Sequence, residues 1–226
     1  MTTTLPWDGI LMPREAYGPA AVKARDSLTD TAAQGDWRRA LSQVRNDYTV
    51  GVNTWKIGGE SMFTPLHHAA YLGAPRETVQ ELLSLGGVRS LPTAHGETPY
   101  QLAKRRGHDH LLDMLDPYFR PGTPLGDNLE NVNLHVNTTL AELTAEFRGE
   151  NQLRTFDVRL ISEEGGPDEA WFTAPGMYGG IRIGMFWGRA HLEYNSRMGD
   201  SYAVVGPEGS AYVSRSKRAV PALPVR

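Results

Sequence analysis

The 226-residue chain contains no cysteine. Without thiols it can form no disulfide, bind no metal through thiolates and use no cysteine nucleophile. It also lacks any apolar run close to the roughly 20 residues that a membrane-spanning helix needs. Because its formal net charge is −3, it lacks the basic excess typical of nucleic-acid-binding proteins. We therefore expect neither a membrane segment nor a nucleic-acid partner.

Common catalytic and phosphate-binding motifs are missing as well. The chain has neither G-x-G-x-x-G nor G-x-x-x-x-G-K-[ST], and neither G-x-S-x-G nor H-E-x-x-H. The first 18 residues carry prolines and charges of both signs, which is unlike a secretory signal. We therefore predict a cytoplasmic protein that holds no cofactor and no metal.

A recurring helical pattern stands out in the first half of the chain. Residues 64–73 read T-P-L-H-H-A-A-Y-L-G. Thr64 suits a helix N-cap, Pro65 suits the first helical position, and Gly73 suits the left-handed residue that ends a helix. A second T-P pattern begins at Thr98, 34 residues after the first, and ends at Gly107. An apolar segment typical of a second helix follows each pattern, which predicts repeated helical hairpins.

This pattern resembles the ankyrin-repeat family, whose repeats are about 33 residues long. Residues 28–41 look like a weaker first repeat, so the resemblance implies a stack of about three repeats. The later repeat departs from the family motif, because Gln101 replaces the histidine and Lys104 replaces the second alanine. The resemblance also implies that a protein partner docks on the concave face. The partner-binding residues predicted by alignment to the motif are Trp55, His68, Tyr71 and Arg105.

The second half of the chain has a different pattern. Proline and glycine interrupt helical periodicity across residues 117–127, and a helix is then predicted within 134–147. Alternating apolar residues predict strands at 156–161, 181–183, 191–194 and 201–205. The expected fold is α+β, an N-terminal ankyrin-repeat helical stack followed by a small, mostly antiparallel β-sheet domain with one helix. The expected parts are an N-terminal extension (1–26), the repeats (27–116), a linker (117–127), the α+β domain (128–213) and a tail (214–226).

Residues 171–180 read W-F-T-A-P-G-M-Y-G-G. This resembles a segment in the tails of uncharacterised bacterial ankyrin-repeat proteins, in which a glutamate and, four residues later, an arginine follow. Large aromatic side chains concentrate between residues 171 and 194, where they either fill a core or line a pocket. The residues predicted to line such a pocket are Trp171, Tyr178, Arg182, Trp187, Glu193 and Arg197.

Three functions stay open from the sequence. The first is a module that binds a protein partner through the concave face. The second is a small-molecule-binding protein or a cofactor-independent enzyme, with its site in the sheet domain or at the domain junction. For such an enzyme Glu193 is the acid–base candidate, because aromatic surroundings raise a carboxyl pKa, and Tyr178 and Arg197 would orient the substrate. The third is a self-associating scaffold.

Overall fold

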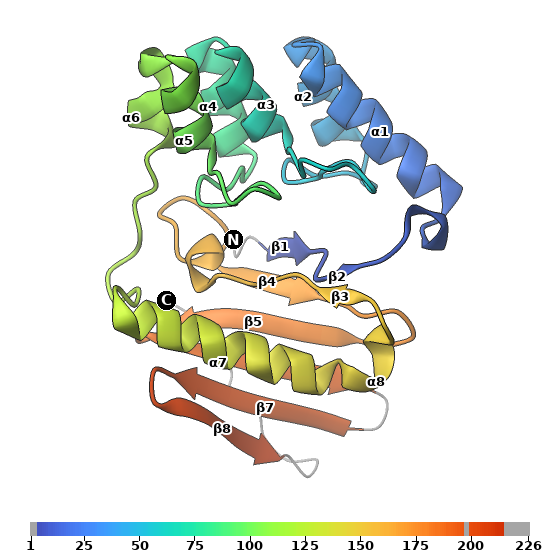
Figure 1. Cartoon of the computed structure of the whole chain (residues 1–226), viewed down its shortest axis with the longest axis vertical. Coiled ribbons are helices and arrows are strands. Elements are labelled where there is room, and N and C mark those ends of the chain that lie inside the picture. The colour runs from blue at the N-terminus through green and yellow to red at the C-terminus, as the bar shows by residue number, and fades with distance from the viewer. Residues whose placement is uncertain (1–3, 197–198, 215–226) are drawn as a thin grey trace. The chain divides into compact units, whose positions relative to one another are not determined.

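The computed structural model describes residues 4–196 and 199–214. It is an α+β structure, with an N-terminal helical region and a six-stranded, mostly antiparallel sheet against which one helix packs (Figure 1). No helix within the described ranges is long and apolar enough to cross a membrane. The chain forms two compact units. The first comprises the chain up to Leu5, Met12–Pro121 and Arg159–Asp168, and the second comprises Pro6–Leu11, Gly122–Val158 and the chain from Glu169 onward.

The helices of the first unit come in pairs. Helix α1 packs against α2, α3 against α4, and α5 against η2 and α6 (Figure 1). The first helix of each pair also packs against the next, in the order α1, α3, α5. The bounds are η1 Arg14–Ala16, α1 Pro19–Ala33, α2 Trp37–Asn46, α3 Pro65–Leu72, α4 Arg76–Ser84, α5 Pro99–Arg106, η2 Asp109–Leu111 and α6 Leu112–Leu115.

Helices α3 and α5 begin and end in the same way. Each has a threonine N-cap and proline at the first helical position. The threonine side chain accepts a hydrogen bond from the backbone N–H of the third helical residue, and the side chain of that residue accepts one from the threonine N–H. Each ends at a glycine with positive φ, 65° at Gly73 and 75° at Gly107. A residue with a Cβ avoids this left-handed conformation, so glycine is the natural terminator. The helices predicted after Thr64 and Thr98 are thus confirmed.

The side chain of His67 fastens the start of α3 to a distant loop. It is fully buried, and its Nδ1 accepts a hydrogen bond from the backbone N–H of Thr64 at 3.2 Å. Because Nδ1 accepts, the ring proton lies on Nε2, which donates to the carbonyl of Leu91 at 2.9 Å. The same ring therefore caps a helix and holds the loop between α4 and α5.

A buried carboxylate holds residues 159–168 in the first unit. The side chain of Glu163 is fully buried and accepts hydrogen bonds from the backbone N–H of Arg89 at 3.0 Å and of Ser90 at 2.5 Å. The Ser90 hydroxyl donates to the same carboxylate at 2.6 Å, and the guanidinium of Arg89 lies 3.6 Å away. A buried charge needs such partners, and here they come from a loop more than 70 residues earlier in the chain.

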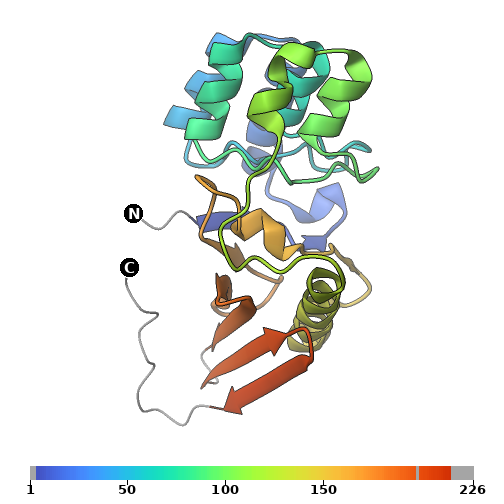
Figure 2. The ribbon, with the colours of Figure 1, turned by 90° about the vertical axis from the view of Figure 1, so that its left-hand side faces the viewer.

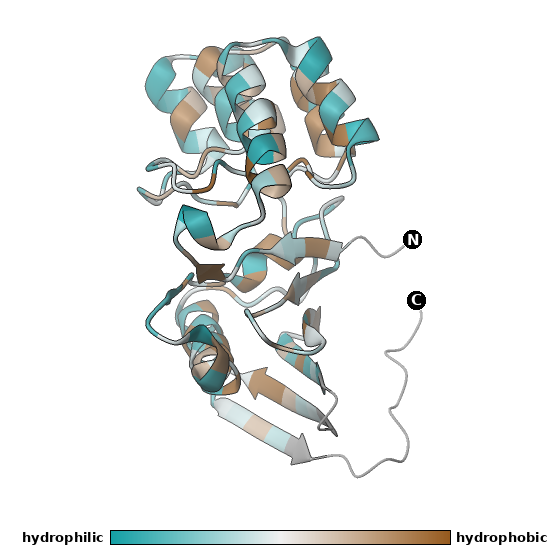
Figure 3. Ribbon diagram, turned by 90° about the vertical axis from the view of Figure 1, so that its right-hand side faces the viewer, coloured by the Kyte–Doolittle hydropathy of each residue, from teal (hydrophilic) through white to brown (hydrophobic). Residues whose placement is uncertain are grey.

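The sheet has the strand order β1-β4-β5-β6-β7-β8, and its strands β4 to β8 belong to the second unit. Neighbouring strands from β4 to β8 pair antiparallel. Hydrophobic and hydrophilic residues are interspersed along these strands (Figure 3). A separate pair joins β2 to β3. The bounds are β1 Thr4–Trp7, β2 Ile10–Leu11, β3 Gln152–Leu153, β4 Glu169–Phe172, β5 Gly180–Phe186, β6 Arg189–Ser196, β7 Gly199–Gly206 and β8 Gly209–Ser214. The strands predicted at 181–183, 191–194 and 201–205 are confirmed within β5, β6 and β7.

Helix α7 (Asp127–Leu143) covers one face of this sheet (Figure 2). It buries Val132, Val136 and Leu140, which lie four residues apart and so share one side of the helix. The sheet buries alternate side chains, among them Phe172, Ile181, Ile183, Leu192, Ala203 and Val205. The helix predicted within 134–147 is found as the end of α7 and the short α8 (Ala145–Arg148).

The strand predicted at 156–161 is wrong, because residues Val158–Ile161 form the 3₁₀ turn η3. The backbone N–H of Phe156 donates to the side chain of Asn137 at 2.8 Å, and that side chain donates back to the Phe156 carbonyl at 2.8 Å. The backbone N–H of Val158 donates to Asn133 at 3.0 Å. Two asparagines of α7 thus satisfy backbone groups that a partner strand would otherwise pair with.

Two glycines with the same backbone conformation give a matched test of packing in the first unit. A Cβ at Gly73 would lie 2.5 Å from Nδ1 of His108, whereas nothing lies within 4 Å of a Cβ at Gly107. Both Gly→Ala substitutions carry the left-handed backbone cost of about 1–2 kcal/mol. We expect Gly73→Ala to lose a further ~1 kcal/mol or more in urea unfolding, because the His108 ring must move. Equal losses in the two variants would contradict the close packing of His108.

Candidate functional site

Partly buried aromatic side chains and an exposed arginine gather beside α3 and α5. The ring of Phe63 lies 5.3 Å from that of His68 and 5.9 Å from that of Tyr71, centroid to centroid. The guanidinium of Arg106 lies 4.3 Å above the Tyr71 ring. Leu72, next to Tyr71, is 43% exposed. We call this group, Phe63, His68, Tyr71, Leu72 and Arg106, the Tyr71 surface.

The helical period of α3 explains why His68 and Tyr71 are only partly buried. Leu66, Ala69 and Ala70 are completely buried and turn one side of α3 toward the core. His68 and Tyr71, three residues apart, lie on the other side. Arg106 reaches Tyr71 from the last turn of α5, which packs beside α3. The surface therefore depends on the packing of two neighbouring helix pairs.

Ion pairs flank the Tyr71 surface. Arg105 donates to both carboxylate oxygens of Glu97, from Nε at 2.7 Å and from Nη2 at 3.0 Å. Lys56 donates to Asp30 at 2.7 Å. Both pairs are exposed, so each contributes little to stability. Their effect is to fix the positions of charges around the aromatic cluster.

The predicted partner-binding residues divide between surface and interior. His68 and Tyr71 belong to the Tyr71 surface, and Arg105 is exposed beside it. Trp55 is only 4% exposed and lies in the interior. Sequence reasoning missed Phe63, Leu72 and Arg106. Leu72 and Arg106 occupy equivalent positions in α3 and α5, one residue after the predicted Tyr71 and Arg105, so including that position in the alignment would have found both.

The pKa of the His68 imidazole lies well below its ordinary value. Burial lowers the pKa of His68 from 6.5 to about 4, while the nearby carboxylate of Asp30 acts in the opposite direction. Burial disfavours the charged imidazolium, so His68 is neutral at physiological pH. His68 therefore adds no charge to the Tyr71 surface, in which the charged member is Arg106.

A row of side chains crosses the sheet of the second unit on the face opposite α7. Trp171, Arg182, Glu193 and Tyr202 are direct partners on the adjacent strands β4, β5, β6 and β7. Their alternation with the buried residues places them all on the same face. The structure therefore brings together three of the residues predicted to line a pocket: Trp171, Arg182 and Glu193.

The charged side chains of this row form ion pairs within the sheet. Arg182 lies between two carboxylates, with its Nε 3.5 Å from Glu169 and its Nη1 3.7 Å from Glu193. Cross-strand pairs of opposite charge stabilise sheets by a few tenths to about 1 kcal/mol. The indole of Trp171 lies over Gly180, where a Cβ would come within 2.6 Å of the ring. Each of these contacts has a structural role in the sheet.

The aromatic and acid–base groups near this row are dispersed. The Tyr202 hydroxyl is hydrogen-bonded to Nδ1 of His191, whose pKa is lowered chiefly by burial. Tyr178 is 63% exposed and precedes β5, whereas Trp187 is 87% exposed and follows it. Consequently these two rings lie at opposite ends of that strand. Arg197 lies outside the described residues.

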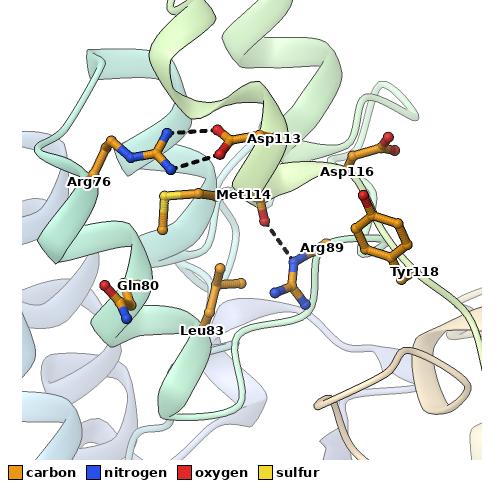
Figure 4. Close-up of a pocket in the computed structure, with 8 residues that line it drawn as sticks. All are labelled: Arg76, Gln80, Leu83, Arg89, Asp113, Met114, Asp116 and Tyr118. Atoms are coloured by element: carbon orange, nitrogen blue, oxygen red, sulfur yellow. Dashed lines mark hydrogen bonds and ion pairs between the residues drawn. The ribbon is translucent and has the colours of Figure 1, made fainter.

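The structure does contain a hollow in the first unit, and none of these residues lines it. It has a volume of about 340 Å³ and opens between α4 and the segment η2–α6 (Figure 4). Arg76 donates to both oxygens of Asp113 at 2.7 Å, and Nε of Arg89 donates to the Met114 carbonyl at 2.8 Å. The lining residues are Arg76, Gln80, Leu83, Arg89, Asp113, Met114, Asp116 and Tyr118.

Metal-ligating side chains do not cluster in the part of the chain that the structure describes. Within residues 4–196 and 199–214, no group of three or more histidine, aspartate or glutamate side chains is arranged to hold an ion. In the hollow, Arg76 and Asp113 form an ion pair with each other. Neither charge is therefore available to bind a charged ligand. The Tyr71 surface is therefore the best candidate site.

The pKa of His68 predicts a specific dependence of stability on pH. Because unfolding restores the ordinary pKa of 6.5, the unfolded chain binds more protons than the folded chain between pH 4 and 6.5. The free energy of unfolding should therefore rise with pH across this window, by about 3 kcal/mol from His68 alone. Urea unfolding at several pH values should show a smaller rise in His68→Gln, while the exposed control His95→Gln keeps the full rise. An unchanged slope in His68→Gln would refute the assignment.

Comparison with known proteins adds no family to this picture. No protein-family model matches the chain, and a search of curated proteins finds no match. The assignment of a function therefore rests on the geometry and chemistry of the chain's own residues.

Proposed function

We propose that the first unit is a short ankyrin-repeat stack and that the chain binds a protein partner through the Tyr71 surface. The repeated helix pairs, the threonine–proline starts and the glycine ends of α3 and α5 support the first part. The cluster of Phe63, Tyr71 and Arg106 carries the second part. Tyrosine and arginine are among the residues most enriched at the energetic centres of protein interfaces.

The arrangement of Tyr71 also favours binding energetically. Its ring contacts Phe63 on one side, and Arg106 lies over its face, so the side chain is already held in place. Immobilising a free side chain at an interface costs about 0.5–1.5 kcal/mol. A ring that is ordered before binding avoids most of that cost. Leu72 adds exposed apolar area beside it.

The alternative of a small-molecule site or an enzyme in the sheet has weaker support. Glu193, the acid–base candidate, is engaged with Arg182, and Tyr178 is exposed beyond the start of β5. Catalysis requires its groups to converge on one reacting atom. The hollow described above lies in the helical unit and includes neither side chain. The protein-binding proposal therefore accounts for more of the observed geometry.

Site-specific photocrosslinking tests the proposed function. A benzophenone amino acid placed at Tyr71 of the full chain should form an adduct with one protein in an extract of the source cells. The same probe at Glu77, which is exposed on α4, should not. The adduct protein is then identified, purified and tested for binding to the chain without the probe.

Affinity measurements on that purified partner decide the outcome. Tyr71→Ala should weaken binding by roughly tenfold to a hundredfold, the range typical of an aromatic residue at the centre of an interface. Glu77→Ala should bind as the unmodified chain does. The proposal fails if the two probe positions give the same adducts, or if Tyr71→Ala binds the purified partner normally.

A further inference from the structure

The Tyr71 surface ends in an arginine whose charge stays available. The last turn of α5 carries three cations in a row, Lys104, Arg105 and Arg106. Glu97 engages Arg105 through two hydrogen bonds. Within residues 4–196 and 199–214, no ion pair joins a carboxylate to Arg106, whose contact is the face of the Tyr71 ring. Arg106 is also exposed.

Contact with the Tyr71 ring prepares this guanidinium to bind an anion. The N–H groups of a guanidinium over an aromatic face that do not point into the ring can donate outward. Two parallel N–H donors match the two oxygens of a carboxylate, which makes such pairs short and directional. Because the ring of Tyr71 already orients Arg106, little side-chain freedom is lost when the anion binds.

The charges around the Tyr71 surface have the same preference. Two carboxylates, Asp30 and Glu97, accompany a larger number of cations. Those cations are Lys56, Arg105 and Arg106. Since the neutral imidazole of His68 adds no charge, the surface as a whole is positive. Charge complementarity therefore points to an acidic partner.

We propose that the partner presents an acidic peptide segment to the Tyr71 surface. A carboxylate of this segment binds the guanidinium of Arg106 side-on, and an apolar side chain beside it packs on Tyr71 and Leu72. The inference rests on the proposed function, because it assumes that this surface binds a protein. It adds the chemistry by which the partner is recognised.

Selection from a random peptide library displayed on phage tests this recognition even while the partner is unidentified. The full chain is immobilised, and binders are sorted by whether they also bind the Tyr71→Ala variant. Peptides that need Tyr71 should be enriched in aspartate or glutamate next to an apolar residue. Their affinity should fall as salt increases, because the contact is between exposed charges.

Substitutions of Arg106 test the role of the guanidinium on synthetic copies of the selected peptides. Arg106→Gln should weaken binding by about tenfold or more, as expected when one charged hydrogen-bonded pair is lost. Arg106→Lys keeps the charge but not the paired donors, so it should restore only part of the affinity. Arg39→Gln on α2, which is also exposed, serves as the control and should bind normally.

The outcomes of these experiments separate the two proposals. Peptides that need Tyr71 but show no acidic preference, and that bind Arg106→Gln normally, would overturn the acidic-segment inference and leave protein binding intact. A selection that yields no peptide dependent on Tyr71 would count against both. Full restoration of affinity by Arg106→Lys would overturn the side-on contact, because a single point charge would then suffice.

Discussion

The hydrogen bonds of the His67 ring are the constraint on which the described site depends. One ring nitrogen accepts from the backbone of Thr64 and the other donates to Leu91, so the ring connects the start of α3 with the loop before α5. This fixes the rotation of α3 about its own axis. Because one side of the helix is anchored in the core, His68 and Tyr71 lie on the other side, where both are partly buried. The site follows from the anchoring of a residue that is not part of it.

The contrast between two arginines explains why the helical surface, and not the sheet, is the stronger candidate. Arg182 in the sheet lies between Glu169 and Glu193, and its charge is paired with these carboxylates. Arg106 lies on the ring of Tyr71, which orients the guanidinium without neutralising it. A stacked cation remains free to meet an anion from outside, whereas a cation between two carboxylates must first lose a partner.

Local patterns in the sequence predicted local structure correctly. They failed where the conformation of a segment depends on residues far away in the sequence. The caps and terminators of α3 and three strands of the sheet could be read from spacing alone, because each depends on neighbouring residues. Residues 156–161 could not, because the asparagines of α7 supply their backbone partners. The burial of Trp55 and the stacking of Arg106 on Tyr71 also depend on contacts between separate segments. No local pattern encodes such contacts.

Hydrogen exchange of the backbone amides, measured with and without the bound partner, tests the central claim most directly. If the Tyr71 surface is the binding site, the partner should slow exchange in residues 63–72 and in the last turn of α5. Exchange in α4 and in strands β4–β7 should stay as it is in the free chain. Slower exchange in the strands that carry Trp171, Arg182 and Glu193, with none in α3, would contradict the account.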